Sequence, residues 1–285
     1  MRNRTGWIFS LAGVVIFSGH ARLRAQVVDK PQEDSKAIKA MVDDSVSWYQ
    51  VFSDASASEA MAPQRVLRWQ NGTRGTQESD GVFVLWVHQG RPEASASIFP
   101  YEGSIHYELV SLSRESKLVA REDGRVIWSP ATPGVAFKDI PGAPAPADTP
   151  AARLKQMKGL ADRFKVALTG RKADKSDREE LRLLPRPLYR HELSEAPGPG
   201  AGRIDGGVFA FVQGTDPEAI LLLEAVHPDG RPRWQYAFAR ATSGGLEARL
   251  DTPVVWAVDS LAGRTTPLDP QMWLGRPRGK TASGR

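Results

Sequence analysis

One stretch of this sequence occurs twice, and the repetition constrains the fold more than any other feature. Residues 81–99 read "GVFVLWVHQGRPEASASIF", and residues 206–224 read "GGVFAFVQGTDPEAILLLE". Both contain Gly-Val-Phe, an apolar run, a turn with glycine and then Pro-Glu. An internal repeat of this kind predicts two copies of one structural unit in the chain.

The repeat extends over most of the sequence. An amphipathic helix is predicted over 35–52, and a second helix begins at Thr149, the N-cap, with Pro150 at its first position and ends near Gly170. Short apolar segments separated by glycine turns follow each helix. We predict an α+β fold, an internally duplicated helix-plus-antiparallel-meander unit, whose two mostly antiparallel sheets pack together or form one open barrel. The expected strands are 65–69, 82–88, 93–99, 104–111, 117–121, 125–128, 186–192, 207–213, 218–226, 232–240, 246–250 and 253–258.

Composition divides the chain into five parts. Residues 1–25 have the basic, apolar and small-residue layout of a signal peptide, with an uncleaved anchor as the alternative. The first repeat covers 26–129, a Pro/Ala-rich linker 130–148, the second repeat 149–260 and a basic tail 261–285. We expect truncation at residue 260 to leave the fold intact. The Met-Trp-Leu cluster around Trp273 nevertheless suggests that the tail docks, onto its own body or onto a partner.

Charge and cysteine content limit the location and the partners. Residues 26–260 hold 29 basic and 32 acidic side chains, so the excess of positive charge lies at the two ends. A nucleic-acid-binding protein would carry that charge on its folded body, and this class is therefore excluded. The chain has no cysteine. We expect export to a bacterial periplasm, envelope or exterior, with membrane contact only through an uncleaved signal.

The sequence holds no strong motif for catalysis. The four histidines after the signal lack the spacing of a metal site, and "GRPRGKT" at 275–281 is too short between its glycines for a phosphate loop. No nucleophile elbow is present. We expect no cofactor, no metal and no catalytic residue.

Residues at matched positions of the two repeats are the binding candidates. Glu93 and Glu218 each follow a proline. They either meet in a shared cleft, or they begin a strand with the side chain in water or paired with Arg121 or Arg249. Tyr107 matches Tyr236 and Trp128 matches Trp256; these rings are core residues or line a ligand groove. His106 lies on the opposite strand face from Tyr107, where a hydrogen-bonded structural role is favoured over catalysis.

Several phrases resemble an uncharacterised family of predicted exported proteins abundant in planctomycete-type bacteria. They are "LLPRPLYRHE" at 183–192, "RWQYAFAR" at 233–240, "GRPEASASIFPYEG" at 90–103 and "LVAREDGRVIW" at 118–128, besides the repeated stretch itself. The resemblance covers roughly residues 36–258. It implies export and the two-part layout. The family brings no assigned activity, cofactor or site residue.

Three functions fit these observations. We favour a non-enzymatic module of the envelope or exterior that binds a protein or glycan partner, and we expect a monomer because the duplication already supplies two units. A carrier of an apolar ligand would need a deep apolar cavity between the halves. A hydrolase or isomerase of NTF2-like type would need His106, Glu108 or His191 to converge in one pocket.

Overall fold

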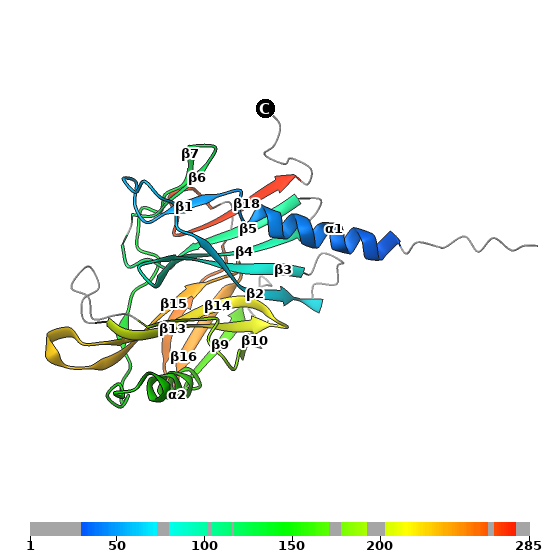
Figure 1. The fold of residues 1–285 in the computed structure, drawn as a ribbon. Coiled ribbons are helices and arrows are strands. Elements are labelled where there is room, and N and C mark those ends of the chain that lie inside the picture. The colour runs from blue at the N-terminus through cyan, green and yellow to red at the C-terminus, as the bar shows by residue number, and fades with distance from the viewer. Residues whose placement is uncertain are drawn as a thin grey trace, which may run out of the picture.

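The computed structural model describes residues 30–72, 80–101, 104–115, 117–170, 178–192, 203–261 and 265–277. The predicted signal peptide lies outside this part of the chain. Two α-helices and four antiparallel sheets make up the described residues, so the predicted α+β fold is confirmed (Figure 1). No closed barrel is formed. The sheets number four because each unit has one large sheet and one small sheet.

The first unit begins with helix α1, Lys30–Ser45. Its small sheet has the order β1-β6-β7, and its large sheet has the order β18-β5-β4-β3-β2. The strands are β1 Gln50–Phe52, β2 Pro63–Gln70, β3 Asp80–His88, β4 Arg91–Tyr101, β5 Ser104–Ser111, β6 Val119–Glu122 and β7 Arg125–Trp128. Strand β18, Gln271–Pro277, reaches this sheet from the far end of the chain.

The second unit repeats this order after helix α2, Pro150–Ala161. Its small sheet is β10-β9-β16-β17, and its large sheet is β11-β13-β14-β15-β8, with β12 also paired to β13. The strands are β8 Lys138–Asp139, β9 Phe164–Thr169, β10 Arg178–Glu180, β11 Arg182–Leu183, β12 Tyr189–Glu192, β13 Arg203–Gln213, β14 Asp216–Val226, β15 Arg233–Arg240, β16 Gly245–Leu250 and β17 Val254–Val258. A short 3₁₀ helix, Pro228–Gly230, lies between β14 and β15.

The two units are equivalent strand by strand. The small-sheet order β1-β6-β7 corresponds to β9-β16-β17, and β2-β3-β4-β5 corresponds to β12-β13-β14-β15. Both small sheets have an irregularity at the same place, between Ala120 and Arg121 in one and between Ala248 and Arg249 in the other. A bulge at matched positions is a specific local feature. It supports the duplication independently of the sequence pattern.

The units exchange their last strands. Strand β8 follows the first unit in the chain but pairs with β15 of the second, while β18 follows the second unit and pairs with β5 of the first. The predicted linker therefore contributes β8, and Val135 and Ile140 from the same segment are buried. The predicted basic tail likewise contributes a strand that forms seven residue pairs with β5. The expectation that the fold is independent of residues 261–285 is not supported by this arrangement.

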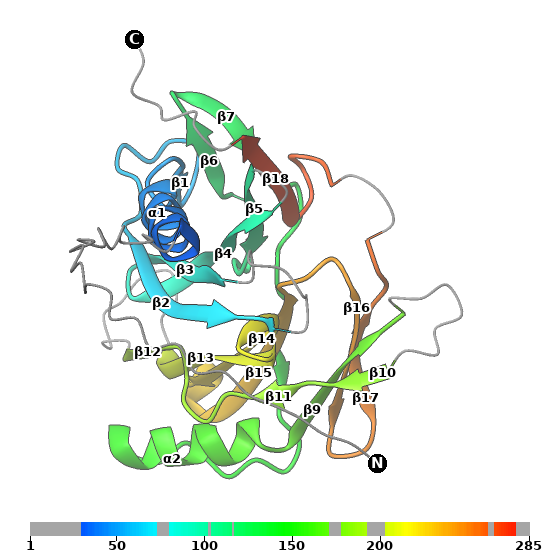
Figure 2. The same cartoon turned by 90° about the vertical axis from the view of Figure 1, so that its right-hand side faces the viewer.

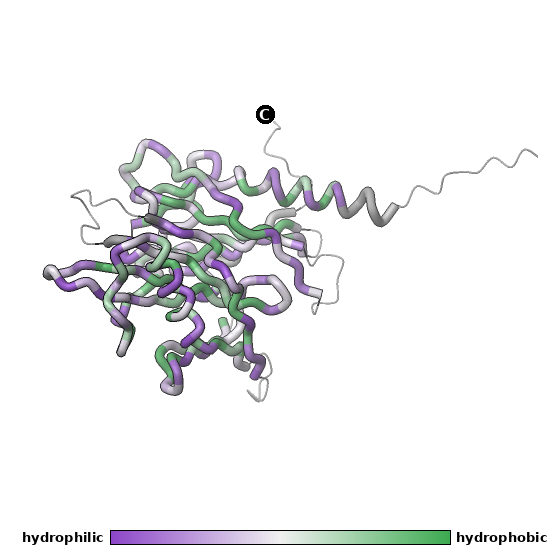
Figure 3. The backbone as a smooth tube through the Cα atoms, turned by 60° about the horizontal axis from the view of Figure 1, so that its bottom comes forward, coloured by the Kyte–Doolittle hydropathy of each residue, from purple (hydrophilic) through white to green (hydrophobic). Residues whose placement is uncertain are grey.

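The elements stack in four layers with three apolar cores. Helix α1 packs on β3 and β4, the two large sheets face each other, and α2 packs on β13 and β14 (Figure 2). Alternate residues of a strand point to opposite faces. Phe83 and Leu85 therefore join the core between the sheets, whereas Val84 and Trp86 join the core under α1. Hydrophobic stretches of the chain, in green, gather toward the interior of the molecule (Figure 3).

Both predicted helices are too long, and for the same reason. Thr149 caps α2 as predicted, its hydroxyl accepting from the Ala152 N–H at 3.3 Å, but α2 ends at Ala161 and residues 164–169 form strand β9. In the first unit the helix ends at Ser45, and residues 50–52 form β1. The helix also begins at Lys30, five residues before the predicted start at residue 35. Each helix is thus followed by a short strand of the small sheet.

Candidate functional site

One row of residues crosses the large sheet of the first unit from strand to strand. Trp69 on β2 pairs with Gly81 on β3, and the register of β3 and β4 places Gly81 opposite Phe99. Phe99 in turn pairs with His106 on β5, and His106 pairs with Gly275 on β18. The row is aromatic wherever it is not glycine. Glycine is required at Gly81, because a Cβ there would collide with the Trp69 ring. The Trp69 and Phe99 rings are 5.6 Å apart, and His106 stacks on Phe99 at 6.0 Å.

The equivalent row of the second unit is polar. His191 pairs with Gly206, Gly206 with Glu224, Glu224 with Gln235, and Gln235 with Asp139. A Cβ at Gly206 would collide with the His191 ring, as at Gly81. The geometry of the row is therefore kept while its chemistry has changed from aromatic to ionisable. Such a difference between duplicated units makes the second row a candidate functional site.

Glu224 is the centre of a buried charge cluster between the units. Its side chain is 0% exposed; Oε1 accepts from Arg91 Nε at 2.9 Å and Oε2 accepts from Arg114 at 2.5 Å. Arg91, also buried, binds Glu93 at 2.8 Å and the Leu112 carbonyl at 3.1 Å. The Arg114 guanidinium lies 3.6 Å from the centre of the Phe137 ring. Strands β4 and β14 of the two units are thereby joined by paired charges.

These contacts decide what the cluster can do chemically. Burial raises the pKa of Glu224, but Arg91 and Arg114 outweigh burial, and the net pKa lies below its ordinary value. Burial lowers the pKa of Arg91, yet Glu93 and Glu224 outweigh it and the net pKa is raised. A general base works best with a pKa near the working pH and with access to a substrate proton. Glu224 has a lowered pKa and both oxygens bound, so the cluster fastens the units together.

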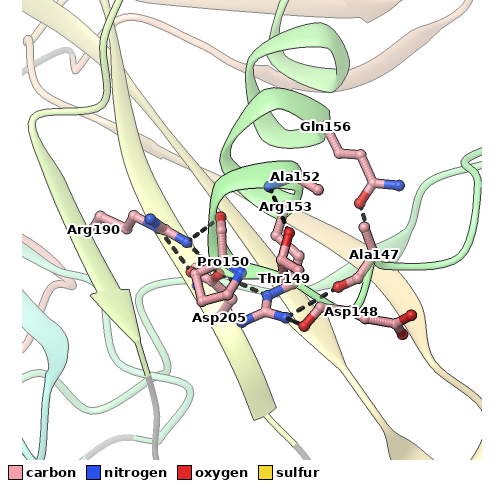
Figure 4. A network of polar contacts seen from close by, with 10 residues as sticks. Ala147, Asp148, Thr149, Pro150, Ala152, Arg153, Gln156, Arg190 and Asp205 are labelled. Carbon is pink, nitrogen blue, oxygen red and sulfur yellow. Dashed lines mark hydrogen bonds and ion pairs between the residues drawn. The ribbon is translucent and has the colours of Figure 1, made fainter.

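A second buried network holds α2 on its sheet. Asp205 is fully buried and accepts from Arg153 at 2.8 Å and from Arg190 at 2.7 Å (Figure 4). Arg153 also donates to the carbonyls of Ala147 and Asp148, just before the helix. A buried carboxylate with two guanidinium partners is fully compensated. The network explains the entry angle of α2 and is structural.

The described residues also line a small, partly open pocket between the two units. Its lining comes from β5, from the end of β15 and the segment after it, from the segment after β17 and from the start of β18: Glu108, Leu109, Val110, Arg240, Thr242, Ser243, Leu261, Thr265 and Gln271. Its volume is about 20 Å³, room for only one or two water molecules. Arg240 is buried there and donates to the carbonyls of Gly244 and Asp259. A metabolite does not fit into this space.

Glu93 and Glu218 are equivalent but lie far apart. The backbone carbonyl of each accepts from the neighbouring strand, Glu93 from Leu112 and Glu218 from Ala241, both at 2.8 Å. Glu93 lies close to Glu224, because Arg91 binds both carboxylates. Glu224 is six residues from Glu218 along β14, and six residues of strand span about 20 Å. The two carboxylates therefore do not share a cleft. The partner of Glu93 is Arg91 and not the predicted Arg121.

The other predicted residues are mostly structural. Arg121 lies over the Phe52 ring at 4.6 Å, and Arg249 pairs with Glu247 at 2.9 Å. The Tyr107 hydroxyl donates to the Ser45 carbonyl at 2.9 Å, and Tyr236 packs on Phe164 at 5.0 Å. The two tyrosines occupy matched places beneath the helix of each unit. This is the core role that the sequence offered as one alternative.

Trp128 and Trp256 are also equivalent, and here the two units differ in exposure. Trp128 is 0% exposed, and its indole N–H donates to the Asp269 carbonyl at 2.8 Å. Trp256 is half-buried and stacks on Phe238 at 5.3 Å. Its indole N–H has no acceptor among the residues that the structure describes. Val254, two residues before it on β17, is 47% exposed. We call residues 254–258 the β17 edge.

The histidines do not converge. His106 stacks on Phe99, whereas His191 lies beside Glu224, which binds Arg91. Arg91 and Phe99 are eight residues apart on β4, about 26 Å. Sequence reasoning missed Arg91, Arg114 and Glu224. The one available signal was a glutamate inside the apolar strand "AILLLEAV" at 219–226.

No group of three or more His, Asp or Glu side chains suited to a metal ion occurs within the described ranges. Among the same residues, no helix is long and apolar enough to cross a membrane. Comparison with family models, with curated proteins and with solved structures finds no match for the chain.

Proposed function

We propose that this chain is an exported, non-enzymatic binding module that binds a short segment of a partner protein along the β17 edge. The observation that carries the proposal is the contrast between Trp128 and Trp256. One chain contains the same position twice, covered in the first unit and open in the second. The covered copy provides an example of what fits there.

In the first unit the cover is the turn at residues 266–269 and the residues on either side of it. Ser129 donates to the Pro267 carbonyl and Ala131 to the Leu268 carbonyl, both at 2.8 Å, beside the indole bond of Trp128 to Asp269. Residues 265–270 thus lie along the end of β7 and close the core beneath it. Main-chain hydrogen bonds to the edge of a sheet are also what gives affinity when a peptide adds to such an edge.

In the second unit the corresponding core is open. Val255, Trp256 and Val258 pack on the core under α2 but remain partly exposed. The strand carries no charged residue and no proline, and it is the outer strand of its sheet. Native proteins usually block such edges with charge, proline or a covering segment. Lys138 provides limited protection by donating to the Val255 carbonyl at 3.1 Å.

The two competing functions have less support. A carrier needs a cavity between the halves, and side chains such as Phe83, Leu85, Ile220 and Leu222 occupy that space. A hydrolase needs convergent polar groups, and His106 and His191 lie at distant places. Export remains part of the proposal on the strength of the signal-like N-terminus and the family resemblance. A monomer also remains part of it, because the two units already bury each other's inner sheet.

Peptide display on the intact chain tests this function. Ala257 is exposed on the β17 edge, and Ala257→Pro removes one outward N–H while keeping the strand at a position where proline is tolerated. Ala257→Ser keeps the N–H and serves as the control. We expect selected peptides to bind the unaltered chain and Ala257→Ser equally and Ala257→Pro at least tenfold more weakly.

Equal binding to Ala257→Pro, or no enriched peptide at all, would overturn the proposal. Thermal unfolding of each variant checks that it is folded. Trp256→Phe is a second variant that keeps an aromatic ring and removes the indole N–H, so the test does not depend on proline being accepted. The same loss of binding is expected for it.

A further inference from the structure

The kind of segment that fits the β17 edge follows from the segment that covers Trp128. We infer that the edge takes a short Thr-Pro-X-Asp turn, the chemistry of residues 266–269, from a partner protein. This inference rests on the proposed function and narrows it to one class of peptide.

The covering turn is held together by its own side chains. The carboxylate of Asp269 accepts from the Thr266 N–H at 2.6 Å and from the Thr266 hydroxyl at 3.0 Å. The Asp269 N–H donates back to the Thr266 carbonyl at 3.1 Å, and the Thr266 hydroxyl accepts from the Leu268 N–H at 3.3 Å. A segment that is ordered before it binds loses little conformational entropy on binding. Thr266 and Asp269 are therefore the residues that define the turn.

The turn presents carbonyl groups to the strand that it covers. Its three consecutive carbonyls, from Pro267, Leu268 and Asp269, accept from Ser129, Ala131 and the Trp128 indole. Proline at position 267 costs nothing in this contact, because only its carbonyl is used. The Leu268 side chain is 61% exposed, so that position is not selected by packing. The recognised pattern is thus Thr-Pro-X-Asp with X free.

The second unit offers a matching main-chain donor beside a matching tryptophan. Trp128 pairs with Ala120 beside a bulge, and Trp256 pairs with Ala248 beside the matching bulge. Ala248 pairs with Val166, whose carbonyl accepts from Leu181 on its other side, so Ala248 and Val166 form a pair without mutual hydrogen bonds. Because bonded and non-bonded pairs alternate, Ala248 is bonded to Trp256, and the pair of Glu247 with Ala257 is a non-bonded one. The Ala257 N–H therefore faces the open side, as the Ser129 N–H does in the first unit.

The test uses the chain's own covering sequence as a separate peptide. N-acetylated TTPLDP amide, residues 265–270, is titrated into the full ¹⁵N-labelled chain while the tryptophan indole resonances are followed by NMR. Trp256→Phe identifies the Trp256 signal. We expect that signal to shift in a saturable manner, and we expect an Asp269→Asn peptide, which lacks the carboxylate of the turn, to bind at least tenfold more weakly.

The outcomes separate this inference from the proposed function. Equal affinity of the Asn peptide, or a shift confined to the Trp128 signal, would overturn the turn assignment. If displayed peptides bind the β17 edge but TTPLDP leaves the Trp256 signal unmoved, the turn assignment fails and the proposed function stands. If neither the displayed peptides nor TTPLDP bind at Trp256, the turn assignment and the proposed function are both wrong. Trp256→Phe must also abolish binding of the peptide to the second unit.

Discussion

Glu224 shows how a single residue can set the relation between two units. Its equivalent in the first unit is Phe99, which packs on Trp69, whereas Glu224 binds two arginines of the other unit. A buried charge pair is not in itself stabilising relative to apolar residues, but removal of one partner leaves the other charge without compensation. The pair therefore acts chiefly as a register lock, because only one placement of β4 against β14 satisfies Arg91.

Replacement of Glu224 tests this role through the dependence of stability on pH. Because the folded pKa of Glu224 lies below the ordinary value of 4.5, its contribution is present above that value and is lost as the pH falls through the folded pKa. We expect Glu224→Gln to lower the free energy of unfolding by about 3 kcal/mol at pH 7. We also expect it to flatten the fall in stability between pH 5 and pH 3, measured by urea unfolding.

Glu247→Gln is the matched control for this measurement. Glu247 pairs with Arg178 and Arg249 on the surface, where an ion pair contributes less than about 1 kcal/mol. If the free energy of unfolding of Glu224→Gln falls as steeply between pH 5 and pH 3 as that of the unaltered chain, the assigned role of Glu224 is wrong.

Residue-level prediction from the sequence succeeded where the cause is local. The Thr149 cap needs only the residues next to it, and the alignment of Tyr107 with Tyr236 needs only the repeat. The partners of Glu224 lie on another unit, with Arg91 133 residues away. Strand alternation gives the face on which a side chain lies, but not the side chain that meets it. The charge cluster around Glu224 could therefore not be predicted from the sequence.

At the scale of elements, the segments after both helices show a limit of periodicity. Phe164 and Leu168 are four residues apart, which fits a helix, but Phe164, Val166 and Leu168 also alternate as in a strand, and all three are buried. Strand is favoured over helix here because β16 pairs with residues 164–169 along their whole length. The same ambiguity occurs at residues 49–52. Pairing with a distant strand overrides the local pattern in both units.

Strand β18 is the element for which the structure and the sequence lead to opposite expectations. It covers the edge of β5 with seven residue pairs, Leu274 packs on the core under α1, and the preceding turn closes Trp128. We expect a chain that ends at residue 260 to unfold more easily than a chain that ends at residue 277, by more than about 2 kcal/mol. Both chains lack the same last eight residues, so the difference belongs to 261–277. Equal urea midpoints would restore the original expectation of an independent tail.

At the scale of the whole molecule, the exchange of β8 and β18 makes each unit depend on the other. The first unit completes its large sheet with a strand from the end of the chain, and the second with a strand from the segment between the units. The inner faces of both sheets are mostly apolar and meet in one shared core, next to the buried pair of Arg91 and Glu224. Duplication usually yields two domains that fold separately. Here the shared core and the exchanged strands leave no boundary at which the chain divides.

A single cooperative unfolding transition is therefore expected for the full chain. In calorimetry the ratio of calorimetric to van't Hoff enthalpy should be close to one, the signature of an all-or-none transition. Residues 26–129 or 149–260 expressed alone would each lack one exchanged strand and expose the inner face of a large sheet. Neither should show a cooperative transition. Two resolved transitions in the full chain, or a sharp transition in either half, would mean that the units are independent and that the exchanged strands are merely docked. The open β17 edge would then belong to a domain that folds by itself.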